Sequence, residues 1–417
     1  MSTTFSSLRI PSFRAFIIGS FISFSGTWMM SIAMPWLTLS LTGSAVKGAL
    51  TSMLQTLPVL LFTLFYGAIL DRVNKKSAMR INQVLLTAIT GTLAWLTLTD
   101  RITYPLILVL AFLLGIVNAM DMPARQAIMA EIVPPDQLTN AIALNSGGFN
   151  LSRIFGPSIA GAILAWTSPG VCFSIAAAAY LLFFFLLNFV QLEQIIIRSA
   201  NKPILESIRE GYDYIRRTPI LRTLLSLLSL FGILALNFNV TMPIFARQEM
   251  GYNETQFGLM MSGIGLGAFL ATLMIARNSN PLARIRNLLL APFITAVALL
   301  LLSQARSFPL ILALTVLCGF GMIMFAPNAN ATVQSNSRPE MHGRVMSFYT
   351  FLFIGSTPIG NMLVGYLGDN FGARAMFYVP GLLLILMFGL VYRMERVALY
   401  TDRTLAPKPT ANSVTEL

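Results

Sequence analysis

The feature that most constrains this chain is a series of apolar runs of about 20 residues that recurs along the whole sequence. A helix needs about 20 apolar residues to cross a hydrocarbon core of about 30 Å. Runs such as AAAAYLLFFFLLNFV do not alternate polar and apolar residues as the strands of a β-barrel do. Charged residues make up only 11% of the chain, against roughly 25% in soluble domains. The sequence therefore predicts an all-α polytopic membrane protein.

Hydropathy and helix breakers divide the chain into twelve predicted transmembrane helices. Their ranges are 14–39, 47–70, 78–99, 104–127, 139–166, 170–191, 220–246, 255–277, 285–304, 308–330, 342–367 and 371–393. The polar segment RSANKPILESIREGYDYIRRTP, between the sixth and seventh, carries too much charge to cross a membrane. Because Ile204, Ile208, Tyr212 and Ile215 recur there at helical spacing, we expect an amphipathic linker helix at the cytoplasmic surface.

The lysines and arginines predict the orientation of the chain, because cytoplasmic loops of membrane proteins carry the excess of both. Of the 28 such residues, 22 fall on the side of the N-terminus, five on the other side, and one, Arg153, inside the membrane. Both termini are therefore expected in the cytoplasm, and the net charge of +12 becomes a topology signal that does not require a nucleic-acid partner. The N-terminus has no cleavable signal pattern, so the first helix is expected to direct membrane insertion. Cys172 and Cys318 lie within apolar runs and are interpreted as buried thiols.

The two halves of the chain resemble each other at a nearly fixed offset. Met34-Pro35 corresponds to Met242-Pro243, and Gly156 and Gly161 correspond to Gly360 and Gly365. Because each half holds six predicted helices, the two repeats run parallel and pack as two six-helix bundles. The predicted organisation is an N-terminal bundle at 1–191, a cytoplasmic linker at 192–219, a C-terminal bundle at 220–394 and a cytoplasmic polar tail at 395–417.

This layout and the connection GAILDRVNKK resemble the major facilitator superfamily. The superfamily signature after the second helix is met by Gly67, Asp71, Arg72, Lys75 and Lys76, with Asn74 in place of the usual glycine. The segments SLRIPSFRAF, SGTWMMSIAMPWLTLSLTGSA and RIFGPSIAG more narrowly resemble the enterobactin-exporter-like branch of bacterial secondary exporters. The resemblance implies the major facilitator fold and a protein located in the bacterial cytoplasmic (inner) membrane.

The resemblance also implies a conformational latch at the cytoplasmic connection, formed by Gly67, Asp71, Arg72 and Lys75. Gly67 lets a neighbouring helix approach, and Asp71 can cap the N-terminus of a helix in the other bundle. The expected partner is the start of the eleventh helix, at 342–344. The alternative interpretation is a solvated loop whose charges only fix the topology, which accounts well for Lys75.

Two charged residues within the predicted helices, Asp121 and Arg153, are candidates for the mechanism. Asp121, near the end of the fourth helix, has Arg125, Lys75 and Arg72 as candidate partners for a charge relay or proton coupling, or for a plain ion pair. Arg153 lies in the fifth helix, close to the membrane midplane, and is a candidate for binding an anionic or phenolic substrate or for coupling to a protonatable partner. Its alternative role is a hydrogen bond to backbone carbonyls near Pro157.

Polar and aromatic residues of the central helices are predicted to bind substrate together with Arg153, or to join helices to one another. They are Trp28, Trp36, Gln55, Asn118, Asn145, Asn150, Asn237, Asn239, Asn328, Asn330 and Tyr349. Small residues at four-residue spacing predict close helix packing at Gly156, Pro157, Gly161, Gly263 and Gly267.

The predicted function is secondary active export of a small amphiphilic or anionic molecule, such as a siderophore-like metabolite, by alternating access and proton antiport. Multidrug efflux is the alternative, and a non-transporting membrane scaffold or sensor is the alternative of another class. The predicted partners are a small-molecule substrate, protons and membrane lipid, but no nucleic acid, and the protein is expected to be a monomer. Because the sequence has neither a phosphate-binding loop nor a cluster of metal-ligand residues, we predict no cofactor, no metal and no enzymatic activity.

Overall fold

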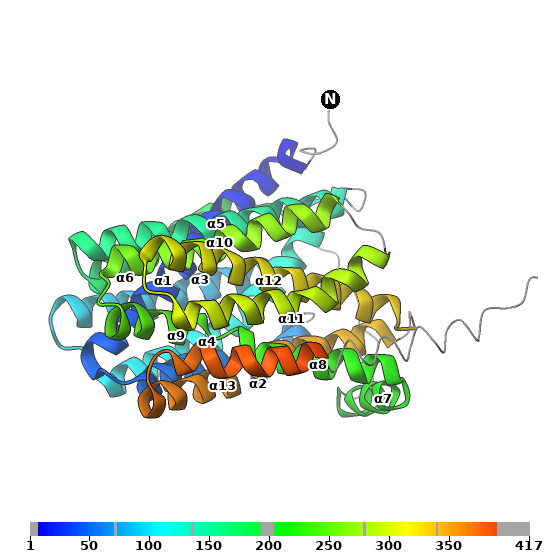
Figure 1. The fold of residues 1–417 in the computed structure, drawn as a ribbon. Helices are drawn as coiled ribbons and strands as arrows, with labels where there is room; N and C mark the ends of the chain where they lie inside the picture. The colour runs from blue at the N-terminus through cyan, green and yellow to red at the C-terminus, as the bar shows by residue number, and fades with distance from the viewer. Residues whose placement is uncertain are drawn as a thin grey trace, which may run out of the picture.

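The computed structural model describes residues 7–70, 73–134, 137–192, 204–277, 281–338 and 341–389, and its elements in these ranges are helices (Figure 1). The first half contains α1 (Pro11–Thr42), α2 (Ala45–Leu70), α3 (Lys75–Leu98), α4 (Tyr104–Ile132), α5 (Leu138–Trp166), α6 (Pro169–Leu186) and η3 (Leu187–Phe189). The linker helix is α7 (Ile204–Arg217). The second half contains α8 (Pro219–Ala235), α9 (Phe238–Ile244), η4 (Phe245–Glu249), α10 (Glu254–Arg277), α11 (Pro281–Gln304), α12 (Phe308–Ser335), α13 (His342–Phe371) and a shorter apolar helix, Ala375–Gly389.

Local sequence signals set where several of these helices begin and end. Proline occupies the first turn of α1, α4, α6, α8 and α12, where its missing N–H costs no helical hydrogen bond. Gly43 ends α1 in the left-handed conformation, with φ of 64°, and its amide donates to the carbonyl of Leu39 at 2.8 Å. The turn at Gly43 therefore reverses the chain directly into α2.

The predicted fold class is confirmed. Within the described residues, ten helical stretches are long and apolar enough to cross a membrane. The 29-residue α5 and the helix Ala375–Gly389 occupy the predicted fifth and twelfth positions. The predicted seventh helix is a broken one, because α8 ends at Ala235 and α9 begins at Phe238.

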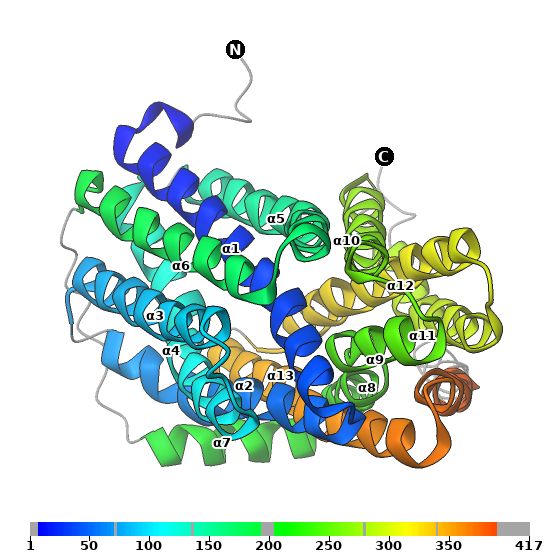
Figure 2. The ribbon, with the colours of Figure 1, turned by 90° about the vertical axis from the view of Figure 1, so that its left-hand side faces the viewer.

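The helices group as the internal repeat predicts (Figure 2). In the first half α1 packs against α5 and α6, α3 against α4 and α6, and α2 against α4. In the second half α12 packs against α10 and α11, and α13 against α8. The most extensive contacts between the halves are those of α2 with α13 and of α5 with α10. The predicted domain boundaries themselves stay predictions.

The two ends of the molecule are named here by the orientation that the lysines and arginines predict. The end that carries the α1–α2 turn at Gly43 is called the outer end, and the end that carries α7 is called the inner end (Figure 1). At the inner end α7 contacts the start of α13 through a Glu210–Arg344 ion pair of 2.5 Å. The backbone N–H of Arg338 donates to the hydroxyl of Tyr214 at 3.1 Å. The linker helix is thus attached to the second half.

The exposed apolar side of α7 is the expected property of a helix at a membrane surface. Ile208 and Tyr212 are 39% and 54% exposed, whereas Ile215 is buried. The side chain of Ile204 lies outside the described residues.

Candidate functional site

Arg153 lies on α5, the helix that contacts α1 on one side and α10 of the other half on the other. Its guanidinium carbon is 5.5 Å from the centroid of the Trp28 ring. The same ring packs against Phe149 at 5.6 Å. A Cβ built on Gly156 would lie 2.6 Å from the Cβ of Trp28, so a glycine at this position lets Trp28 lie against α5.

The Arg153 guanidinium and the indole N–H of Trp28 form a pair of donors, called here the donor pair. The indole Nε1 is buried and has no hydrogen-bond partner in the part of the chain that the structure describes. Among the described carboxylates, none lies within ion-pair distance of Arg153. A cation inside a membrane protein normally has a counter-charge, because its desolvation is costly. The donor pair is therefore suited to receive an anionic or phenolic oxygen from a ligand.

The Asp121–Arg125 pair lies inside the first half. Arg125 is 1% exposed and donates to both carboxylate oxygens of Asp121, at 2.7 and 3.1 Å. Gln83 of α3 also donates to Asp121 at 3.2 Å, and Arg125 donates to Ser23 of α1 at 2.8 Å. The pair therefore joins α1, α3 and α4.

Of the three cations predicted as partners of Asp121, the structure pairs it with Arg125. The prediction of Lys75 as a partner is wrong, because Lys75 forms an ion pair with Glu131 near the end of α4. Arg72 lies outside the described residues. A role of Asp121 in proton coupling stays a prediction.

Trp36 lies at the outer end, about two helical turns from Trp28. Its ring stacks on Phe257 of α10 with centroids 5.2 Å apart, and its Nε1 donates to Glu254 at 3.2 Å. The guanidinium of Arg247 lies 5.2 Å from the ring centroid. The structure therefore places Trp36 in contacts between the two halves and does not bring it to the donor pair.

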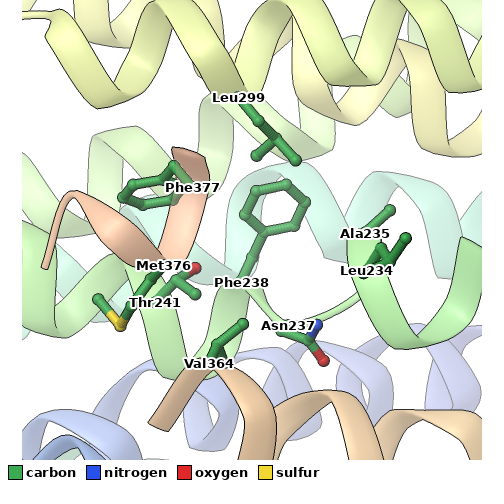
Figure 3. Close-up of a pocket in the computed structure, with 9 residues that line it drawn as sticks. All are labelled: Leu234, Ala235, Asn237, Phe238, Thr241, Leu299, Val364, Met376 and Phe377. Atoms are coloured by element: carbon green, nitrogen blue, oxygen red, sulfur yellow. The ribbon is translucent and has the colours of Figure 1, made fainter. Parts of the chain in front are cut away.

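Asn237 lies at the break between α8 and α9 and faces the interior of the second half (Figure 3). Its amide donates to the carbonyl of Ile233, one turn earlier, at 2.5 Å. Its Oδ1 and the hydroxyl of Thr241 are buried and find no hydrogen-bond partner among the residues described, and both residues line a cavity of about 10 Å³. That volume is about the space of one water molecule. The structure therefore places Asn237 at the helix break, where its side chain bonds to the last turn of α8.

Most of the other predicted substrate residues have partners within the protein. Gln55 donates to the sulfur of Met34 at 2.7 Å, and the Tyr349 hydroxyl donates to the carbonyl of Ala326 at 2.9 Å. The remaining asparagines differ in exposure and partners. Asn328 donates to a carbonyl of its own helix, and Asn330 accepts from Gln334. Asn145 is buried, and its Oδ1 has no partner among the described residues. Asn118 is half-buried, Asn239 is exposed, and the side chain of Asn150 lies outside the described residues.

The sequence model of the transmembrane secretion effector family, a branch of the major facilitator superfamily, matches residues 2–412. The chain belongs to this family. The predicted membership of the major facilitator superfamily is therefore confirmed.

Curated relatives and solved structures agree with the family over most of the chain. The multidrug efflux pump Tap of Mycolicibacterium fortuitum is 27% identical, over 92% of this chain and 95% of the relative. The staphyloferrin A transporter of Staphylococcus aureus is 24% identical, over 92% and 96%. A mutant of the nucleoside transporter NupG has a TM-score of 0.74 at 12% identity, over 92% of this chain and 99% of that one. A bacterial homologue of the human lysosomal transporter Spinster has a TM-score of 0.71 at 13% identity, over 92% and 96%. These structures show the shared fold.

The predicted latch of this secretion effector lies partly outside the described residues, because Asp71 and Arg72 are not among them. Gly67 is in the last turn of α2. In the expected partner region, Arg344 pairs with Glu210 of the linker helix. The latch itself stays a prediction.

The small residues lie at three different helix contacts. Gly156 faces α1, as described above. A Cβ built on Gly161 would lie 2.7 Å from the Cα of Gly258 on α10, and one built on Gly258 would lie 2.9 Å from the carbonyl oxygen of Pro157. Gly263 and Gly267 face α12, where a Cβ on Gly267 would lie 2.7 Å from the backbone nitrogen of Phe320.

Sequence reasoning missed Asp369, in the last turn of α13. Its carboxylate accepts hydrogen bonds from the start of α2, in the other half. A signal was present, because Gly365 and Asp369 repeat the four-residue spacing of Gly67 and Asp71 at the end of an apolar run.

Proposed function

We propose that this protein is a secondary active exporter that moves a small anionic or amphiphilic molecule out of the cytoplasm by alternating access, with proton antiport as the driving reaction. The family and the relatives support export, since the relatives include efflux pumps and the staphyloferrin A transporter. The protein is a multi-pass membrane protein. The proposal places it in the bacterial inner membrane as a monomer, with both termini in the cytoplasm.

The observation that carries the substrate class is the donor pair. A guanidinium without a carboxylate partner among the described residues lies beside a buried indole N–H that is likewise unpaired there. Together they offer hydrogen bonds and positive charge to an oxyanion. A cationic drug would instead meet an uncompensated positive charge. We therefore favour an anionic substrate with an aromatic or chelating group, such as a siderophore-like metabolite.

Multidrug efflux is the second candidate, favoured by the relatives Tap and macrolide efflux protein A of Streptococcus pyogenes. The two candidates differ in what the cells release. We expect cells that lack the gene to secrete less anionic chelator under iron limitation. Unchanged chelator secretion together with increased drug sensitivity would replace the siderophore proposal with drug efflux.

The role of Arg153 can be measured on transport by the purified protein in vesicles with an imposed pH gradient. Hydrogen bonds to charged groups contribute about 1.5–3 kcal/mol. At about 1.4 kcal/mol for each factor of ten, Arg153→Gln should raise the KM for an anionic substrate roughly 10- to 150-fold. Arg153→Lys retains the charge but lacks the planar guanidinium, so its KM should lie between those of the unmodified protein and Arg153→Gln.

Arg101 provides the matched control for this measurement. Its guanidinium lies 5.9 Å from the ring centroid of Trp95, and it is exposed at the outer end. Arg101→Gln should therefore leave the KM unchanged. An Arg153→Gln protein with the KM of the unmodified protein would contradict anion recognition by Arg153.

A further inference from the structure

The outer end joins the two halves through six hydrogen bonds among the described residues, called here the outer seal. With the donor named first, these hydrogen bonds are Trp36 to Glu254, Ser44 to Asp369, Ala45 to Asp369, Val46 to Asp369, Arg247 to Ser40 and Gln248 to Gly43. Three of the six hydrogen bonds converge on one carboxylate. Asp369 therefore connects the halves more extensively than any other residue of the outer seal.

The carboxylate of Asp369 caps the N-terminus of α2 from the opposite half. The backbone amides of Ala45 and Val46, the first two residues of α2, donate to its oxygens at 2.6 and 3.1 Å. The hydroxyl of Ser44 donates at 2.6 Å and accepts from the backbone amide of Lys47 at 3.3 Å. The first amides of a helix have no partner within the helix, and the helix dipole favours a negative charge at this end.

Small residues make this cap possible. A Cβ built on Gly365 would lie 2.5 Å from the Cβ of Ala49, and one built on Gly368 would lie 2.8 Å from the Cβ of Ala45. The last two turns of α13 therefore lie directly against the first two turns of α2. If these helix ends separated, all three hydrogen bonds to Asp369 would be lost together.

We propose that Asp369 is the residue that locks the outer end closed, and that loss of its cap on α2 shifts the protein toward an outward-open state. The proposal rests on the alternating access of the proposed function. Trp36 and Glu254 support the lock from α1 and α10, but each of them makes a single hydrogen bond in the outer seal. Asp369 thus determines how readily the outer end opens.

The test measures distances between spin labels by double electron–electron resonance in the full-length protein in lipid nanodiscs. Thr99 and Arg306 are exposed at the outer ends of the two halves, and Val73 and Arg286 are exposed at the inner ends. Each is replaced by cysteine, in pairs, after the buried Cys172 and Cys318 have been replaced by alanine. The distance measurement needs no substrate, so it can fail or succeed independently of the proposed transport function.

We expect Asp369→Ala to increase the ratio of long to short outer distances about ten-fold or more, since it removes a charged cap and all three of its hydrogen bonds. Asp100→Asn is the matched control, because Asp100 is an exposed acid at the same end, and it should leave the distances unchanged. Ser44→Ala removes one donor and should give a smaller shift, which keeps the test available if Asp369→Ala does not fold. Outer distances in Asp369→Ala, or in Ser44→Ala if that variant alone folds, that match those of the unmodified protein would overturn the proposal.

Discussion

Replacing Arg125 alone should destabilise the protein more than replacing Arg125 and Asp121 together. Arg125→Met leaves the Asp121 carboxylate buried, with Gln83 as its remaining donor within the described ranges. Removal of one partner from a buried ion pair costs about 3–5 kcal/mol. The double variant, Asp121→Asn with Arg125→Met, carries no buried charge at this site. Its cost is lost packing against Phe24 and Phe183 and lost hydrogen bonds, about 1–3 kcal/mol.

The double variant should therefore be about 2 kcal/mol more stable than Arg125→Met alone. The chain offers its own reporters of unfolding, because Cys172 and Cys318 are free and fully buried. A thiol-reactive dye added during a denaturant titration in detergent should label them only as the protein unfolds. The midpoints for the single and double variants then give the order of stability.

Arg101→Met, at an exposed position, is the control and should unfold at the midpoint of the unmodified protein. The reasoning is refuted if the double variant is as unstable as the sum of its two single changes. That result would mean that Asp121 and Arg125 stabilise the fold independently, through separate neighbours.

Two further predictions concern helix contacts. Gly161→Ala should destabilise the protein by about 1–3 kcal/mol, because its Cβ would lie 2.7 Å from the Cα of Gly258. Gly147 lies on the same helix, and a Cβ built there would contact no other described helix within 4 Å. Gly147→Ala should therefore be neutral or stabilise by up to about 1 kcal/mol in the same dye assay. Lys75→Glu should destabilise the inner end, and adding Glu131→Lys should restore about 1 kcal/mol, since the structure pairs these two residues; no recovery in the double variant would contradict the pairing.

Hydropathy alone was sufficient to locate the membrane-spanning helices, because the thickness of the hydrocarbon core sets their length. The predicted first helix, 14–39, is extended to Pro11–Thr42, and the predicted linker helix corresponds to Ile204–Arg217. The helical ends differ by a few residues, since helices continue past the apolar core into the interface. The break at Asn237 was not predicted, because no single residue there forbids a helix.

The candidate site could be predicted only in part. An arginine within an apolar run is rare because burying its charge in the membrane is costly, so Arg153 could be identified from the sequence. The residue that pairs with a given charge was harder to find. Lys75 was a candidate partner for Asp121, yet it meets Glu131, and Arg344 of the expected latch region meets Glu210. Helical spacing shows which face a residue occupies, but it contains no information about which helix covers that face.

The sequence by itself determined the membrane class, the helix count, the internal repeat and the family resemblance. Each of these depends on local composition or on comparison of one segment with another. The tertiary structure alone decided that Asp369 caps α2, that Trp36 joins the halves and that Trp28 lies beside Arg153. These contacts join residues more than 100 positions apart. Gly156 lets α5 lie against Trp28, and Gly365 lets α13 lie against α2, so the contacts depend on how the helices approach one another.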